Sequence, residues 1–254
     1  MLKSLLCSTF LLFTFSVSAQ APEPVPLARG NTPGEPHHHL KIENEYVRVY
    51  YVEVPPHENT QLHQHDHDYI YVSLGPSDVV NAIQNKPEIH LQLKDGETHF
   101  TRGGFAHVAR NLADTPFRNV TIELLRPQGE VSNLCAQVAA NASSAGCNKP
   151  LVSSKGGHGF TTQGQMETPE AWLDLVRLDP ETRGSVALPS ETLVVVLNDC
   201  AVQVGVKGQP GKTLQEGEVA WVEPHSRGVA FNTSPKPSSF LQLTFKGGST
   251  AVKP

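Results

Sequence analysis

The sequence predicts an all-β protein that contains two β-barrels in tandem. Short β-branched segments are separated by clusters of Gly, Pro, Asn and Asp, and a pattern of turn residues recurs further along the chain. No stretch of helical length has a sustained 3.6-residue apolar period. Short, closely spaced strands of this kind are typical of sandwiches and barrels, whereas parallel sheets alternate strands with helices.

Residues 1–19 have the features of a signal peptide. Lys3 supplies a positive charge, residues 5–15 are apolar, and residues 17–19 (Val-Ser-Ala) offer a small-residue cleavage site. The apolar run is shorter than the ~20 residues that a membrane-spanning helix needs, which disfavours an uncleaved anchor. We therefore expect a protein without a membrane span that is exported to the periplasm or secreted.

Three further ranges differ in composition. Residues 20–42 are rich in proline and polar side chains and predict an extended leader. Residues 43–130 contain alternating β-branched segments that predict a first barrel, and the Ser-, Ala- and Gly-rich residues 131–166 predict a linker or long loop. The expected strands of the first barrel lie at 46–54, 70–74, 89–93 and 120–124.

Residues 167–254 repeat the pattern of the first barrel. Gly96 precedes Asn111 by fifteen residues, and Gly217 precedes Asn232 by the same number. The offset between the two pairs is 121 residues (217 − 96 and 232 − 111). A repeat of this size indicates two copies of one β-domain.

The composition narrows the class of partner. Twenty Lys and Arg against 25 Asp and Glu give a formal charge of −5, so no basic excess favours nucleic acid. A small-molecule ligand or substrate is the expected partner. The 12 histidines are the unusual feature, because four of them lie within eleven residues: His57, His63, His65 and His67.

Two cysteines flank a loop of small residues. Cys135 and Cys147 enclose this loop, and a disulfide between them is consistent with an oxidising compartment. Cys200 would then remain as the odd cysteine.

His63 and His65 are separated by one residue in a strand-like context. Alternate side chains of a strand point to the same face, so the two imidazoles converge. Neighbouring neutral imidazoles are common ligands of transition metals, and a ligand from an adjacent strand would complete a site. His107, just after the glycines Gly103 and Gly104, is the best candidate for that ligand.

These residues resemble the two sequence motifs of the cupin family. The first motif is written G(x)5HxH(x)3–4E(x)6G and the second G(x)5PxG(x)2H(x)3N. The second motif matches at Gly96, Gly104, His107 and Asn111, with Arg102 in place of proline. The resemblance implies two tandem barrels of the double-stranded β-helix, or jelly-roll, type.

The first motif matches at its two histidines, His63 and His65, whereas its acidic residue is displaced. His57 stands where the family has the opening glycine. Asp68 follows His65 by three residues, which is closer than the family's glutamate, and Tyr69 occupies the other possible register.

The resemblance implies that His63, His65 and His107 bind one divalent metal, with Asp68 as the fourth ligand and His67 as its substitute. Such a donor set suits Fe, Mn, Ni, Cu or Zn and does not discriminate strongly among them. It leaves coordination positions open, as metal catalysis requires.

Other residues close to the ligands in sequence are expected to border the site: His57, His67, Phe105 and Asn111. The candidates for a catalytic role are Asp68, Tyr69 and Tyr71. Strand alternation leaves open whether Tyr71 or Ile70 faces the interior. The three histidines at 37–39 are expected to lie in a solvated tail, with adventitious metal binding as the alternative.

The second half of the chain lacks the histidine pattern. Gly228 stands where the first half has His107, and no histidine pair occurs around residues 186–193. We therefore expect one metal per chain, held in the N-terminal barrel.

The signal peptide and the open coordination positions together favour an exported metal-dependent enzyme, and dioxygenase chemistry is the first hypothesis. The nearest analogues are bicupin dioxygenases that act on flavonols or other phenolic compounds, an analogy that rests on fold alone. Two alternatives stay open: a metal- or ligand-binding protein without turnover, and a metal-dependent isomerase, lyase or decarboxylase. A homodimer through sheet edges is a further expectation, unless the two repeats already pair within the chain.

Overall fold

The described part of the chain is built from β-strands, as the sequence predicts. The computed structural model describes residues 32–133, 152–153, 159–188, 190–198, 201–205, 212–224 and 226–247. Within these ranges, no helix is long and apolar enough to cross a membrane. The signal-peptide range and the cysteines Cys135, Cys147 and Cys200 lie outside the described residues.

The first barrel consists of a 3-10 turn, η1 (Thr32–Gly34), and two antiparallel sheets. One sheet has the strand order β1-β2-β9-β4-β7, and the other has the order β3-β8-β5-β6. The strands are β1 (His38–Glu43), β2 (Val47–Val54), β3 (His63–His65), β4 (Asp68–Ser73), β5 (Ser77–Ile83), β6 (Ile89–Leu93), β7 (Thr98–Thr101), β8 (Phe105–Asn111) and β9 (Phe117–Leu124).

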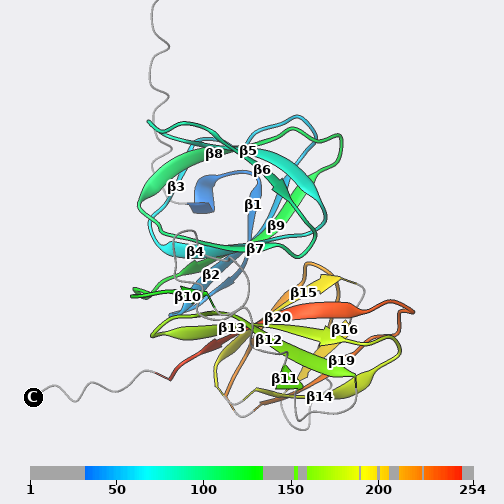
Figure 1. The fold of residues 1–254 in the computed structure, drawn as a ribbon. Helices are drawn as coiled ribbons and strands as arrows, with labels where there is room; N and C mark the ends of the chain where they lie inside the picture. The colour runs from blue at the N-terminus through cyan, green and yellow to red at the C-terminus, as the bar shows by residue number, and fades with distance from the viewer. Residues whose placement is uncertain are drawn as a thin grey trace, which may run out of the picture.

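The second barrel lies below the first in Figure 1. Its described strands form a sheet of order β10-β12-β13-β20-β15-β18, with β11 paired to β12, and a sheet of order β14-β19-β16-β17. They are β10 (Ser132–Asn133), β11 (Val152–Ser153), β12 (Phe160–Glu167), β13 (Ala171–Leu178), β14 (Arg183–Leu188), β15 (Thr192–Asn198), β16 (Ala201–Gly205), β17 (Lys212–Leu214), β18 (Val219–Val222), β19 (Ser226–Phe231) and β20 (Ser238–Phe245).

The strand orders confirm the internal repeat. The order β2-β9-β4-β7 recurs as β13-β20-β15-β18, and β3-β8-β5-β6 recurs as β14-β19-β16-β17. Asn111 and Asn232 secure equivalent turns, because the side-chain amide of each donates to three backbone carbonyls. The acceptors are Val54, Pro55 and Thr115 in the first barrel and Leu178, Asp179 and Lys236 in the second.

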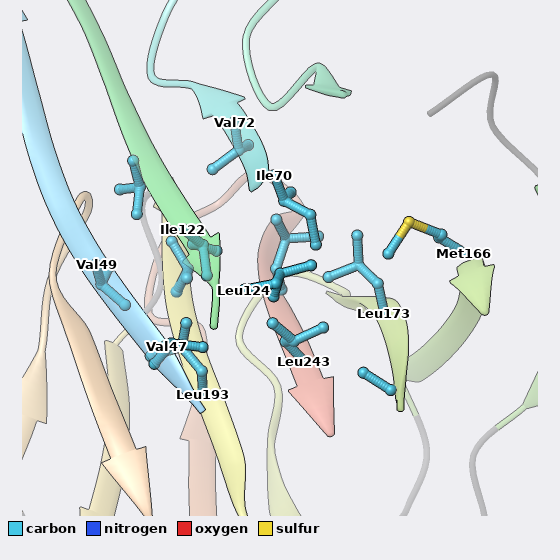
Figure 2. Packing of buried hydrophobic residues seen from close by; sticks show 14 of the residues in the cluster. Val47, Val49, Ile70, Val72, Ile122, Leu124, Met166, Leu173, Leu193 and Leu243 are labelled. Atoms are coloured by element: carbon cyan, nitrogen blue, oxygen red, sulfur yellow. The ribbon is translucent and has the colours of Figure 1, made fainter. Parts of the chain in front are cut away.

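The two barrels share one hydrophobic core. Val49, Ile70 and Ile122 from the first barrel belong to the same buried cluster as Leu173 and Leu243 from the second, and Figure 2 shows these side chains meeting between the strands. Burial of each such side chain stabilises the fold by roughly 1.5–3 kcal/mol. The two repeats therefore pack against each other within the chain.

The first barrel begins earlier than predicted. Residues 32–42 were expected in the leader, but η1 and β1 lie in this range, and β1 pairs with β2. Thr32 and Glu35 are buried although their sequence is polar, because their side chains are hydrogen-bonded inside the barrel. Figure 1 shows η1 within the outline of this barrel.

The second barrel also begins before the predicted boundary at residue 167. Strand β12 starts at Phe160 and pairs along its length with β13, although residues 131–166 were expected to form a linker. The small and polar residues that favoured a loop here are accommodated in a strand because Phe160 and Met166 are buried at its two ends.

Candidate metal centre

Three of the predicted ligands meet on two paired strands. His63 and His65 alternate on β3 and are 2% and 1% exposed. His107 on β8 is directly opposite His63 in the antiparallel register. The ring centres of His63 and His107 are 4.5 Å apart, and those of His65 and His107 are 5.2 Å apart. The pleat of the two strands thus brings the three imidazoles to one inner face.

A fourth histidine, His38 of β1, completes the cluster. Its ring centre lies 4.6 Å from that of His63, and the ligand atoms of His38, His63 and His65 all lie within 4.8 Å of one another. His38 had been expected in a solvated tail, yet its side chain is only 4% exposed. Sequence spacing does not indicate this contact, because the packing of β1 inside the barrel creates it.

Each of the four imidazoles has its Nδ1 next to an oxygen. The partners are the Glu35 carboxylate for His38 (2.6 Å), the Gln61 carbonyl for His63 (2.8 Å), the Glu123 carboxylate for His65 (3.1 Å) and the Asn81 side-chain oxygen for His107 (2.7 Å). We assign the proton to Nδ1 in each case, since these oxygens accept. The lone pair of each neutral imidazole is then on Nε2, as a metal ligand requires.

Two of these Nε2 atoms have no partner among the described residues. They belong to His63 and His107, and both atoms are buried. A buried polar atom without a hydrogen bond is costly, and a metal ion is one of the few groups that would satisfy two nitrogens at once. The residues therefore fit a metal ion.

Burial disfavours the charged form of three of these histidines, His38, His63 and His107. It lowers the pKa of His63 to about 3, and the neighbouring imidazoles of His38 and His65 act in the same direction. Burial also lowers the pKa of His107 well below its usual value and lowers that of His38, where Glu35 opposes the effect. Protons therefore compete weakly with a metal at these sites near neutral pH.

Two buried carboxylates stand behind the histidines. Glu35 accepts from the Gln61 backbone N–H and from His38, whereas Glu123 accepts from Thr32 (2.6 Å) and from His65. Burial alone would raise the pKa of both carboxyl groups, but these hydrogen bonds lower it. Sequence reasoning missed both residues, because they lie far from the histidine motifs along the chain.

Asp68, predicted as the fourth ligand, does not reach the cluster. It precedes Tyr69 and Tyr71 on β4 by one and three residues, so its side chain points to the opposite face. There it pairs with Arg102 at 2.7 Å and accepts from the backbone N–H of Gly103 at 3.1 Å. Asp68 and Arg102 both depart from the family motifs, and they contact each other.

Tyr69 and Tyr71 both face the interior of the barrel, whereas Ile70 faces the second barrel. The ring of Tyr69 stacks on that of His65 with centres 4.2 Å apart. Burial raises the pKa of both tyrosine hydroxyls, with Tyr71 adding to the effect at Tyr69 and Glu97 adding to it at Tyr71. Both hydroxyls are therefore protonated at neutral pH. The Tyr69 hydroxyl has a hydrogen bond with Thr101, which opposes the rise in its pKa, whereas the Tyr71 hydroxyl is available as a hydrogen-bond donor.

The four residues expected to border the site are not among those that line the cavity at the histidines. His57 is exposed and pairs with Asp114 at 2.9 Å. His67 lies with Asp68 in a separate surface hollow. Phe105 packs on the side of His107, with ring centres 5.5 Å apart, and Asn111 secures its turn.

The histidines form one wall of a cavity of about 60 Å³. Its opposite side is apolar and includes Val52, Val79, Leu93 and Phe117. Its volume would hold roughly four water molecules. The site is therefore a small, half-polar chamber inside the first barrel.

The equivalent region of the second barrel has lost the ligands. Val186 pairs with Gly228 there as His63 pairs with His107, and Leu188 takes the place of His65. Leu188 is buried in an apolar cluster with Phe160 and Phe240. Within the described residues, the grouping of three potential ligands occurs in the first barrel.

Known structures with this arrangement of strands are cupins. Oxalate decarboxylase from Bacillus subtilis, in a single-substitution variant, has a TM-score of 0.52 at 10% identity, over 81% of this chain and 70% of its own. A cupin 2 conserved barrel domain protein from Leptotrichia buccalis has a TM-score of 0.50 at 11% identity, over 82% and 88%. AerE from Microcystis aeruginosa has a TM-score of 0.52 at 11% identity, over 84% and 98%.

The chain thus has the fold of the cupin superfamily, in the two-barrel form that the sequence motifs imply. No protein-family model and no curated protein sequence matches the chain. Since the identities to the known structures are 10–11%, the likeness concerns the fold. The chemistry has to be argued from the residues of this site.

Proposed function

We propose that this protein is a metal-dependent enzyme whose ion is held by His38, His63, His65 and His107. The observation that carries the proposal is the shared geometry of the four imidazoles. Each presents Nδ1 to an oxygen, and the buried Nε2 atoms of His63 and His107 are without partners among the described residues. Hydrogen bonds of this kind orient metal-binding histidines in proteins generally.

The chemistry of the donors favours a divalent transition metal. Imidazole suits Fe, Ni, Cu and Zn, and Mn(II) centres occur in Bacillus subtilis oxalate decarboxylase, which has the same fold. All four donors are imidazoles, and the carboxylates of Glu35 and Glu123 accept hydrogen bonds from the Nδ1 atoms of two of them, His38 and His65. These carboxylates balance the positive charge and raise the basicity of His38 and His65.

We propose a dioxygenase-type reaction on a small organic substrate. When bound, a redox-active metal would supply open positions at which dioxygen and the substrate react. No carboxylate is among the described residues that line the cavity. An isomerase or decarboxylase that relied on a carboxylate base would therefore lack that base at the site. The Tyr71 hydroxyl would donate a hydrogen bond to a substrate oxygen and orient it, and the apolar wall would exclude water.

Metal content and oxygen incorporation test this proposal. The protein, purified from its native compartment, is expected to hold about one redox-active metal per chain, and a panel of small substrates under ¹⁸O₂ is expected to yield a labelled product. The variant His107→Ala should lose both properties, whereas His90→Ala, at an exposed histidine, should retain them. Zinc alone would overturn the dioxygenase proposal, and absence of metal would overturn the metal-dependent enzyme.

We also propose that the chain is exported. The charge, apolar run and small-residue site of residues 1–19 support this proposal. Mass spectrometry of the mature protein should find Gln20 at the N-terminus, in an extracytoplasmic fraction. A full-length chain in the cytoplasmic fraction would contradict it.

A further inference from the structure

The size of the cavity limits its occupant. Its volume of about 60 Å³ is less than half that of the ~150 Å³ apolar cavity known to bind benzene in another protein. Leu91, Leu93 and Phe117 form much of the wall opposite the histidines. An aromatic ring would have to displace these side chains, and densely packed interiors resist such displacement.

The charge of the cavity limits its occupant as well. No Lys or Arg is among the described residues that line it. The carboxylates of Glu35 and Glu123, both buried behind the histidines, place two negative charges there, and Arg48 pairs with Glu123 at 3.2 Å. A divalent ion would therefore leave at most one net positive charge at the site, which suits a neutral or singly charged occupant. A second negative charge in this low-dielectric chamber would have no cation to pair with, which is strongly unfavourable.

Two side chains that line the cavity offer donors without a partner among the described residues. Asn119 accepts from Thr121 through Oδ1, whereas its Nδ2 has no hydrogen bond among those of the described residues. The Tyr71 hydroxyl likewise makes no hydrogen bond with the described residues. Asn119 and Tyr71 both line the cavity. In two other lining residues the side-chain oxygen is already an acceptor: Thr60 accepts from the Ala109 backbone N–H, and Asn81 accepts from His107 Nδ1. Amide and hydroxyl donors match a carbonyl or carboxylate oxygen.

On the basis of the metal site proposed above, we infer that the substrate is smaller than a benzene ring, carries at most one negative charge, and has one oxygen-bearing end and one short apolar end. The oxygen-bearing end lies toward the histidines, and Tyr71 and Asn119 supply further donors along the cavity lining. The apolar end contacts Val79, Leu91 and Phe117. This class excludes flavonols and simple phenols and excludes small dicarboxylates.

Three anions test the inference on the Co(II)-loaded protein, through changes in the visible spectrum of cobalt. Acetate has the inferred size and charge, benzoate adds a ring at the same charge, and sulfate adds a charge at similar size. We expect saturable binding of acetate and at least tenfold weaker binding of benzoate and of sulfate. Benzoate or sulfate bound as tightly as acetate overturns the inference.

Two variants sharpen the test. Leu91→Ala enlarges the cavity and should strengthen benzoate binding at least tenfold, whereas the same change at the exposed Leu112 should leave it unaltered. Glu35→Gln removes a buried charge and should favour sulfate, whereas Glu45→Gln, at a carboxylate that is 72% exposed, should not. If Leu91→Ala leaves benzoate binding unchanged, the size limit is wrong. A protein that retains no cobalt overturns the proposed function itself, which is a distinguishable result.

Discussion

The two barrels of this chain share their strand order and differ in what the strands enclose. The first barrel directs histidines and tyrosines inward around a small cavity, whereas the second fills the same region with Leu188, Phe160 and Phe240. The turn asparagines, Asn111 and Asn232, make the same bonds in both. The comparison teaches that the fold depends on turns and on the shared core, and that the chemistry depends on a few inward positions.

The largest expected effect is loss of metal from the first barrel. His107→Ala removes an imidazole whose Nε2 is buried and without a partner among the described residues. Changes to residues that merely orient metal ligands cost ~10–100-fold in affinity, so loss of a ligand should exceed ~100-fold. Calorimetric titration of the metal-free protein measures it. If metal stays bound in His107→Ala, the metal site lies elsewhere in the protein. The proposed difference between the two barrels would then be wrong.

The core between the barrels should respond next most strongly. Ile122→Ala in the first barrel and Leu243→Ala in the second each leave a void in the same cluster, at an expected cost of about 2–5 kcal/mol in unfolding free energy. Both variants should unfold in one thermal transition, because the two barrels share this core. Two separate transitions would show that the barrels fold independently. Leu112→Ala, at an exposed position, is the matched control.

The turn asparagines offer a symmetrical test. Asn111→Ala and Asn232→Ala each leave backbone carbonyls without a donor, and each should destabilise the protein by about 1–3 kcal/mol. Thermal denaturation should give similar losses for the two variants, while metal stoichiometry stays unchanged. Unequal losses would mean that the repeated turns are not equivalent.

The fold and three of the four histidines could be predicted because their signals are local. His63 and His65 alternate on one strand, and His107 follows a turn with positive-φ Gly104, all within motifs of fixed spacing. The repeat was likewise visible in the spacing of Gly96 and Asn111. Local patterns of this kind report the face of a strand and the position of a turn.

His38, Glu35 and Glu123 could not be predicted, because their positions depend on tertiary packing. His38 reaches His63 only because β1 enters the barrel, and Glu123 reaches His65 across 58 residues of sequence. Asp68 lies away from the histidines for a different reason. The motif favoured an acidic residue near His65, whereas strand alternation places Asp68 outward, beside Arg102.

A moderate effect should follow from pH. The pKa of His63 is about 3 in the folded protein and 6.5 ordinarily, so the unfolded chain binds the proton first. Metal-free protein should therefore hold its stability above pH 6.5 and lose it as pH falls toward 3, by about 1–2 kcal/mol per such histidine between pH 7 and 5. The pKa values of Glu35 and Glu123 are lowered from 4.5, so the stability that these carboxylates contribute is lost only as the pH falls below this window.

Denaturation at several pH values, with chelator present, measures this dependence. His63→Leu should flatten the curve of stability against pH between pH 7 and 5. The leucine side chain binds no proton in either state, so the unfolded variant no longer gains a proton at this position. The surface variant His90→Ala should retain the original slope. An unchanged slope in His63→Leu would mean that His63 does not stay neutral in the fold.

The smallest expected effect concerns Asp68. The Asp68–Arg102 pair joins an 18% exposed carboxylate to a 54% exposed guanidinium. Ion pairs with this degree of exposure contribute ~0–1 kcal/mol to stability. Asp68→Asn should therefore change thermal stability slightly and leave metal affinity within about twofold, as calorimetry would measure. A large loss of affinity would mean that Asp68 turns inward when metal binds, and the site would then resemble the family's three-histidine, one-carboxylate set. An unchanged affinity would leave His38 as the residue that takes the place of that carboxylate.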